Sequence, residues 1–288
     1  MHHRAKNKPR AATASEKVRL AHPAAMPGLQ LLHARFHRQT FPRHSHEGYG
    51  VGVIEAGALG FFYRGENLVA PAGRINTVNP GEVHTGQAVA EQGWTYRMFY
   101  FSAEFLRRTS EAVAGRPVSL PFLTQGVIDD PELAGLIRQT HILLGSRQAA
   151  QLEQETLLLT LFARLLARHT YEPPAMAAVG AEPVAVRRVI DYLDAHCGEE
   201  LRIDTLAGIA CLSPYHFIRV FARHTGLTPH AWLMQHRTRK ARQLLEHGVA
   251  IADAAAQTGF VDQSHLTKSF KRLLGYTPGQ LRNCVQDA

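Results

Sequence analysis

Two stretches near the C-terminus decide the fold: residues 203–226, IDTLAGIACLSPYHFIRVFARHTG, and residues 252–275, ADAAAQTGFVDQSHLTKSFKRLLG. They follow one pattern, displaced by 49 residues. Eight pairs of identical residues keep this offset: Asp204 with Asp253, Ala207 with Ala256, His216 with His265, Phe221 with Phe270, Arg223 with Arg272, Gly226 with Gly275, Thr228 with Thr277, and Pro229 with Pro278. Such a repeat indicates that one small structural unit occurs twice.

Each copy predicts a short helix, a tight turn and a second helix that ends at a glycine, Gly226 or Gly275. Ser213 and Asp262 stand where the second helix needs an N-cap. This is helix-turn-helix organisation. Residues 229–248 between the copies predict a connecting helix. About 18 helical residues span about 27 Å, so two second helices could lie near the ~34 Å spacing of successive major grooves.

The second helix of each copy has an apolar face and an outer face rich in hydrogen-bond donors. Donors at the start of such a helix suit the base edges and phosphates of the DNA major groove. The candidate DNA contacts are Tyr215, His216, Ile218, Arg219, Arg223, Gln263, Ser264, His265, Thr267 and Lys268. An ordinary solvated helix face is the alternative, but equivalent positions in both copies favour DNA binding. Ile218 is apolar and offers at most a contact with a thymine methyl group.

Charge is unevenly distributed along the chain. Residues 1–19 carry six Lys and Arg against one Asp or Glu, residues 20–183 carry 13 against 14, and residues 184–288 carry 13 against nine. A basic C-terminal region suits a polyanionic partner, because Lys and Arg that neutralise phosphates release counterions. No apolar run approaches the ~20 residues that span a bilayer, and no secretory signal follows the basic start. We therefore expect a cytoplasmic protein without a membrane partner.

Residues 186–282 resemble the DNA-binding domain of AraC/XylS-type transcription regulators. The resemblance lies in DTLAGIACLSPYHFIRVFARHTGLTPHAWL, in RTRKARQLL and in IADAAAQTGFVDQSHLTKSFKRLLGYTP. It implies promoter binding by two helix-turn-helix units. By position, it implies base or backbone contacts at Tyr215, Ile218, Arg219, Gln263, Ser264, Thr267 and Lys268.

The N-terminal half has the pattern of an antiparallel β structure. Short strands separated by Gly, Pro and Asn are predicted over residues 29–101. In the last strand, Trp94, Tyr96, Met98 and Tyr100 alternate with Thr95, Arg97, Phe99 and Phe101, which predicts two distinct faces. Residues 131–169 then predict two amphipathic helices, which could cover the barrel or pack against a second subunit.

The predicted fold class is α+β with two domains, a β-barrel followed by helices and then an all-α domain. Residues 1–28 are expected to be a disordered basic tail, and residues 29–171 the barrel with its helices. Residues 172–185, rich in proline and small residues, predict a linker. Residues 186–283 form the predicted double helix-turn-helix domain.

Two stretches of the barrel, RHSHEGYGVGVIEAG and APAGRINTVNPGEVHTG, resemble the cupin-like ligand-binding domain of many such regulators. The resemblance places His44, His46 and His84 where many cupins hold a metal. Three interpretations remain open: polar lining of an effector pocket, metal ligands, or structural histidines. The acidic ligand that cupin metal sites usually carry several residues after the two histidines has no counterpart, because Glu47 directly follows His46 and Glu55 lies further on. We therefore assign no metal and no cofactor.

A small barrel can enclose one ligand, and aromatic and cationic side chains could line it. The tentative ligand-binding set is His44, His46, Tyr49, His84, Trp94 and Arg97, with Tyr96 as a further aromatic wall. The expected partners are double-stranded promoter DNA and a small-molecule effector. A homodimer and, for an activator, RNA polymerase are further possibilities. Two rival functions remain. A metal-dependent cupin enzyme would leave the repeat unexplained, and a protein-binding module would leave the basic helices of the repeat unexplained.

Overall fold

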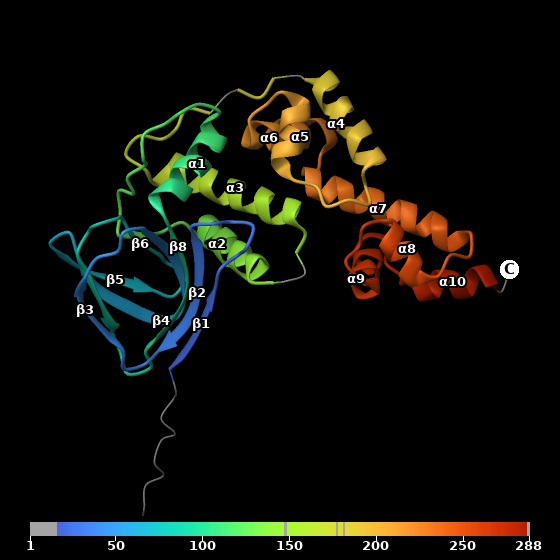
Figure 1. Ribbon diagram of the computed structural model, residues 1–288. Coiled ribbons are helices and arrows are strands. Elements are labelled where there is room, and N and C mark those ends of the chain that lie inside the picture. The colour runs from blue at the N-terminus through green and yellow to red at the C-terminus, as the bar shows by residue number, and fades with distance from the viewer. Residues whose placement is uncertain (1–15, 147–148, 177, 181, 287–288) are drawn as a thin grey trace, which may run out of the picture.

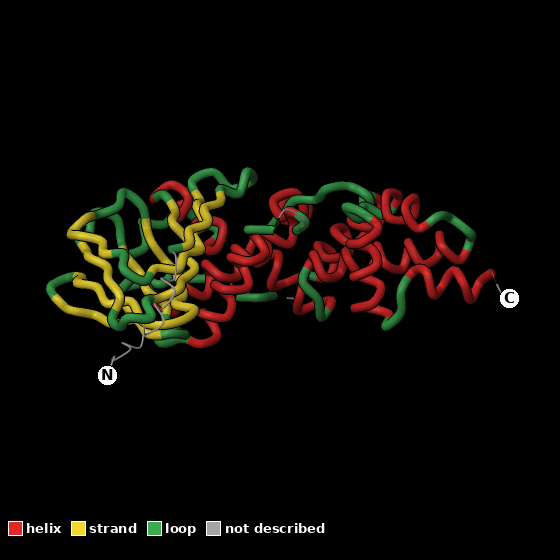
Figure 2. Tube along the Cα trace, turned by 90° about the horizontal axis from the view of Figure 1, so that it is seen from below, coloured by secondary structure: helices red, strands yellow, loops and turns green. Residues whose placement is uncertain are grey.

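The computed structural model describes residues 16–146, 149–176, 178–180 and 182–286 (Figure 1). An N-terminal β domain and a C-terminal helical domain lie at opposite ends of an elongated molecule, as Figure 2 shows. The strands are β1 (Lys17–Ala21), β2 (Leu29–Phe36), β3 (Thr40–His44), β4 (Tyr49–Tyr63), β5 (Glu66–Pro71), β6 (Ile75–Val78), β7 (His84–Ala88), β8 (Trp94–Phe101) and β9 (Val127–Ile128). The two-domain α+β prediction is confirmed.

The long strand β4 holds the β domain together. Its first half pairs with β8 and β6, and its second half pairs with β5 and β7, all antiparallel. The register with β8 shifts between Ile54 and Ala56, and Gly57 follows with φ 69°. A Cβ on Gly57 would lie 2.0 Å from the carbonyl oxygen of Gly93, so only glycine fits this close approach. Because the strand bends at this bulge, β4 can pair with strands on both sides of the barrel.

The two-faced strand predicted at residues 94–101 is confirmed as β8. Trp94, Tyr96 and Met98 belong to a buried cluster inside the barrel, whereas Phe99 and Phe101 belong to the core on the opposite face of the sheet. That second core is covered by three helices, α1 (Ala103–Ala114), α2 (Pro131–Leu144) and α3 (Gln151–His169), which lie between the barrel and the C-terminal domain (Figure 1).

The C-terminal domain contains α4 (Pro183–Ala195), α5 (Ile203–Ala210), α6 (Pro214–Thr225), α7 (Pro229–Glu246), α8 (Ile251–Gln257), α9 (Gln263–Leu274) and α10 (Pro278–Gln286). The predicted units are α5 with α6 and α8 with α9, joined by α7. Each unit has its own apolar core. The buried guanidinium of Arg237 joins them, because it donates to the carbonyls of Cys197, Glu199 and Gly259 at 2.6–2.7 Å.

The structure corrects two predicted boundaries and adds one helix. Strand β1 pairs with β2 inside the stretch predicted as a disordered tail, and residues 1–15 of that stretch lie outside the described residues. Helix α4 begins at Pro183, within the predicted linker. Helix α1 was not predicted; its N-cap Ser102 directly follows β8. Within the described residues, no single helix is long and apolar enough to cross a membrane, and α5 with α6 reaches that hydropathy only as a pair bent by 75°.

Candidate functional site

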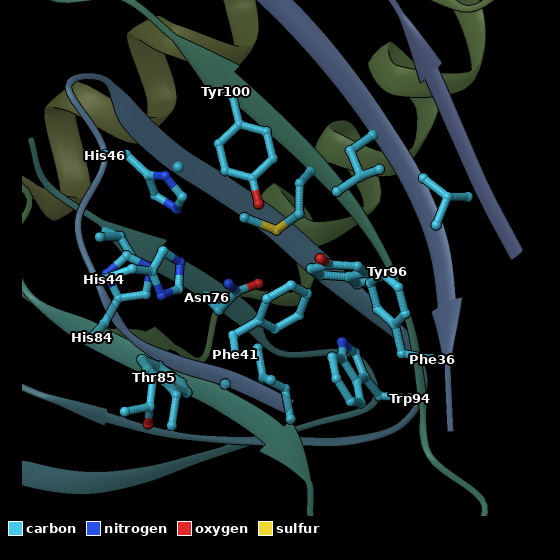
Figure 3. A pocket seen from close by; sticks show the side chains of 18 of the residues that line it. Phe36, Phe41, His44, His46, Asn76, His84, Thr85, Trp94, Tyr96 and Tyr100 are labelled. Atoms are coloured by element: carbon cyan, nitrogen blue, oxygen red, sulfur yellow. The ribbon is translucent and has the colours of Figure 1, made fainter. Parts of the chain in front are cut away.

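A cavity of about 320 Å³ opens inside the β domain, within the size range of small-molecule sites. It has a polar end and an aromatic end (Figure 3). The polar end holds the imidazoles of His44 on β3, His84 on β7 and His46 in the loop after β3. His44 and His84 are register partners across the β3–β7 pair, so the strand pairing itself brings their side chains together.

The three imidazoles form a tight cluster. Their ring centroids lie 4.3–4.9 Å apart. Nδ1 of His44 lies 2.8 Å from the carbonyl oxygen of Pro42, and Nδ1 of His84 lies 3.0 Å from that of Glu82. Burial and then the neighbouring His84 and His44 lower the pKa of His46 to about 4, and burial lowers the pKa of His84. His46 is therefore neutral at pH 7.

The aromatic end of the cavity is formed by Phe36, Phe41, Trp94 and Tyr96, whose rings pack at centroid distances of 5.3–6.4 Å. Two residues that line the cavity carry a polar atom buried without a hydrogen-bond partner among the described residues: Trp94 at its indole Nε1 and Asn76 at Oδ1. Leaving such groups unsatisfied costs about 1–3 kcal/mol each, so a ligand that pairs with them gains affinity. The cavity thus has aromatic walls, and two of its lining residues carry an unsatisfied donor and an unsatisfied acceptor.

The second candidate surface is the start of α9. Asp262 caps this helix, accepting a hydrogen bond from the backbone N–H of His265 at 2.7 Å. Gln263, Ser264 and Lys268 are exposed, and His265 and Thr267 are half-buried. This end of α9 therefore presents amide, hydroxyl and ammonium groups to solvent, as base edges and phosphates require.

The start of α6 has different surroundings. Ile218 is buried in a cluster that also contains Val113 of α1 and Leu152 and Leu159 of α3. The side chain of Ser213 lies beside Gly115 at the end of α1, where a Cβ would come within 3.2 Å of Ser213 Oγ. The first helix-turn-helix unit is thus packed on the helices of the β domain.

A carboxylate from α3 strengthens this packing. Glu155 Oε2 accepts the backbone N–H of Ile203, the first residue of α5, at 2.7 Å, and Glu155 Oε1 lies 3.4 Å from Nε of Arg202. The α5 N-cap, Arg202, makes no side-chain cap of its own. One domain therefore supplies the N-terminal cap of a helix in the other.

Comparison with known proteins adds to this geometry. Residues 26–162 match the family model described as AraC-like ligand binding domain, and residues 206–283 match a helix-turn-helix domain. An uncharacterized HTH-type transcriptional regulator, YbfI of Bacillus subtilis (strain 168), is 32% identical over 79% of this chain and 82% of that protein. The chain belongs to the AraC family of transcription regulators. The family resemblance noted from the sequence is confirmed.

Other similar proteins are also described as transcription regulators. The HTH-type transcriptional activator RhaS of Salmonella heidelberg (strain SL476) is 25% identical over 86% of this chain and 90% of its own length. Among solved structures, the DNA-binding domain of AdpA in complex with a target DNA is 30% identical, covering 36% of this chain and 94% of that one, with a TM-score of 0.35. The curated relatives are regulators, which sets the cupin-enzyme alternative aside.

Within this AraC-family chain, two predicted ligand residues lie outside the cavity. Tyr49 stacks on Phe101 in the helix-covered core and donates to the carbonyl of Pro121 at 2.8 Å. Arg97 pairs with Glu55 at 3.1 Å. The alternation of β8 could have excluded Arg97, because odd-numbered positions share the face opposite Trp94. His44, His46, His84, Trp94 and Tyr96 do line the cavity.

Two predicted DNA contacts also need correction. Ile218 is only 5% exposed and His216 only 8%, with His216 Nε2 3.4 Å from Glu182. Helix periodicity placed Ile218 on the outer face of its unit, and that face is covered by α1 and α3. Tyr215 and Arg219 are half-buried, and Arg223 is exposed and donates to the carbonyl of Val179 at 2.7 Å.

Sequence reasoning missed several residues at the cavity and one at the contact between the two domains. Asn76, Phe36, Phe41 and Tyr100 line the cavity, and Glu155 caps α5. Phe36 ends a strand that pairs with β8, so a correct strand register could have placed it beside Trp94. Nothing in the sequence points to Glu155, because its partner at residue 203 lies 48 positions away.

Proposed function

We propose that this AraC-family regulator binds specific promoter sequences in the cytoplasm and responds to a small-molecule effector held in the β-domain cavity. The observation that carries the effector proposal is the pair of unpartnered polar atoms, Trp94 Nε1 and Asn76 Oδ1, on residues that line a cavity with an aromatic and a polar end. An apolar pocket with a few convergent polar groups is the usual form of a small-molecule site. A compact, flat effector with one acceptor and one donor suits it.

The DNA-reading role falls first on α9. Gln263, Ser264 and Lys268 are exposed at its start, with Thr267 beside them. Amide and hydroxyl groups suit base edges, and the Lys268 ammonium suits base or phosphate acceptors. Tyr215 and Arg219 on α6, half-buried beside the β-domain helices, would contribute more fully once that packing loosens. The homodimer and the contact with RNA polymerase stay predictions.

A short path links the cavity to α6. Tyr96 and Tyr100 lie on β8, and β8 leads directly into α1 through the Ser102 cap. The far end of α1 lies against Ser213, the N-cap of α6. An effector that favours one position of β8 over another would shift the position of α1 and hence the population of packed α6. Effector binding and DNA binding would then be coupled.

The test measures fluorescence anisotropy of labelled DNA fragments from upstream of the regulator's own and neighbouring genes, at two salt concentrations and with competitor DNA. Selective binding that weakens as salt rises is expected. Compounds are then screened for a change in that affinity. Trp94→Phe, which removes the unpaired donor together with part of the indole ring and keeps an aromatic wall, should lose the response and keep DNA binding.

Tyr49→Phe is the matched control, because it removes one polar atom from an aromatic residue of the same sheet outside the cavity. It should keep both DNA binding and the response. Absence of selective binding to every fragment would contradict the promoter proposal. A response that survives in Trp94→Phe at full strength would contradict the cavity as the effector site.

A further inference from the structure

We infer that the free edge of β1 is a docking site for an extended acidic segment of a partner protein, which adds to the sheet as a further strand. Strand β1 ends the sheet, and β2 is the only strand that pairs with it among the described residues (Figure 1). Its other edge therefore presents backbone N–H and C=O groups that no described strand satisfies. An edge of this kind binds extended peptides through main-chain hydrogen bonds.

The start of β1 is held in place by Glu16. One carboxylate oxygen of Glu16 accepts the backbone N–H of Arg38 at 2.9 Å, and the other accepts that of His37 at 2.9 Å. These bonds join residue 16 to the loop between β2 and β3, and every residue of β1 then has a register partner on β2. The edge is thus already in strand conformation, which lowers the ordering cost of binding.

The same strand register builds a cationic band, defined as Lys17, Arg19, His33, Arg35 and Arg97. Lys17 lies opposite Arg35, and Arg19 lies opposite His33. His33 in turn lies opposite Arg97 of β8. Directly opposite residues point to one face of a sheet, so these side chains lie together. Like charges in such positions destabilise a sheet, and the stability of the fold therefore gives no reason for the band.

The band is short of negative charge. Among the described residues, Glu55 is the only carboxylate paired with a member of the band, at 3.1 Å from Arg97, and it is shared with Arg138 of α2 at 3.0 Å. The three exposed members, on β1 and β2, form no ion pair in the described part of the chain. Burial lowers the pKa of His33, and the nearby charge of Arg97 lowers it further. An acidic partner would supply the missing charge.

The other face of β1 indicates which polyanion fits. Val18 and Leu20 alternate with the cations, line the rim of the cavity, and are 52% and 58% exposed. A nucleic acid or an anionic lipid surface would neutralise the cations but leave the backbone edge and these apolar side chains in water. A strand in which acidic and apolar residues alternate satisfies all three, because its side chains also alternate between faces. A second β1 does not fit, since it would bring cations against cations.

The test uses the full chain and a fluorescein-labelled heptapeptide of alternating glutamate and valine, followed by fluorescence anisotropy without DNA. Saturable binding that weakens as salt rises is expected. Lys17→Glu with Arg19→Glu should weaken it at least tenfold, because it reverses the charge beside the added strand. Arg116→Glu with Arg188→Glu, which changes two exposed arginines outside the sheet, is the matched control and should leave the affinity unchanged.

The charge-reversal pair on β1 has a second expected result. It converts two like-charged cross-strand contacts into oppositely charged ones, so it should raise the melting temperature while it removes peptide binding. A change that merely damaged the fold would lower the melting temperature. A lower melting temperature in this variant would overturn the like-charge contacts on which the inference depends.

N-methylation of the peptide tests the backbone edge without changing the protein. In an added strand, the N–H groups of alternate residues point toward β1 and the others toward solvent. N-methyl groups on one alternate set should therefore abolish binding, whereas those on the other set should leave it. Equal affinity of the two methylated peptides would overturn strand addition.

Two further probes separate the protein partner from other polyanions. A peptide of the same composition with its glutamates grouped at one end should bind at least tenfold more weakly, because it lacks the alternation. If a random-sequence DNA duplex or vesicles of anionic lipid depend on Lys17 and Arg19 and the alternating peptide does not bind, the strand partner is overturned in favour of that polyanion. No step uses promoter DNA, so failure here leaves the proposed function standing.

Discussion

The second helices of the two helix-turn-helix units share a sequence pattern but meet different surroundings. Thr267 of α9 is half-buried, with Gln263 and Lys268 exposed on either side. The equivalent residue of α6, Ile218, is buried against helices of the β domain. A thymine-methyl contact was the best DNA role available to an isoleucine there. The comparison teaches that repeated sequence sets the local fold, whereas the neighbouring domain decides which copy is open to DNA.

The largest effect should come from removing exposed polar side chains at the start of α9. Gln263→Ala together with Lys268→Ala should weaken specific promoter binding by about 2–4 kcal/mol, roughly 30-fold or more, because each contact to a base edge contributes about 1–3 kcal/mol. A pair at the start of α6, Tyr215→Ala with Arg219→Ala, whose equivalents on α9 are Ser264 and Lys268, should cost less than about tenfold, since α6 is packed on α1 and α3. Fluorescence anisotropy at fixed salt measures both.

Arg35→Ala serves as the charge control in that experiment, because Arg35 is exposed on the β domain, far along the chain from either recognition helix. It should leave affinity within about twofold, as expected for a surface change away from the DNA. Equal losses from the α6 and α9 pairs would show that both helices read DNA alike, and the contrast drawn here would fail.

The next effect concerns stability. Ile218→Ala should lower the free energy of unfolding by about 2–4 kcal/mol, because it opens a cavity in a packed apolar cluster. Thr267→Ala, at the equivalent position of α9, should change it by no more than about 0.5 kcal/mol. Urea unfolding followed by circular dichroism compares the two variants. A loss of stability from Ile218→Ala as small as that from Thr267→Ala would mean that Ile218 is not buried in solution.

A smaller effect is expected at the cap between domains. Glu155→Ala should destabilise the chain by about 1–2 kcal/mol, because the backbone N–H of Ile203 loses its acceptor at the start of α5. Glu155→Gln keeps an acceptor but loses the charge, so it should destabilise the chain about half as much as Glu155→Ala. Differential scanning calorimetry measures both variants. If alanine and glutamine behave as the parent chain does, the cap contributes nothing.

The smallest effect should be a gain. Helix α8 begins after Ala250, which has no side chain able to cap it, whereas α5 receives its cap from Glu155. Ala250→Asp should therefore stabilise the chain by about 0.5–1 kcal/mol. Ala252→Asp, two residues further into the helix, is the control and should gain less than half as much. A loss of stability in Ala250→Asp would show that the start of α8 has another partner.

Local patterns predicted much of this molecule. The 49-residue repeat predicted α5 to α9, and the alternation at residues 94–101 predicted both faces of β8. The ligand set was predicted less well. His44, His46, His84 and Trp94 line the cavity, but Tyr49 and Arg97 face the helices, because the direction of each side chain depends on strand register.

The sequence by itself determined the two domains, the helix-turn-helix repeat and the presence of three histidines in the barrel, because these depend on short-range periodicity and spacing. Only the tertiary structure decided that His44 and His84 are register partners, that Ile218 is buried between domains, and that Glu155 caps α5. Each of these joins residues from separate elements of the chain. Such contacts are set by packing over the whole molecule, and no local pattern encodes them.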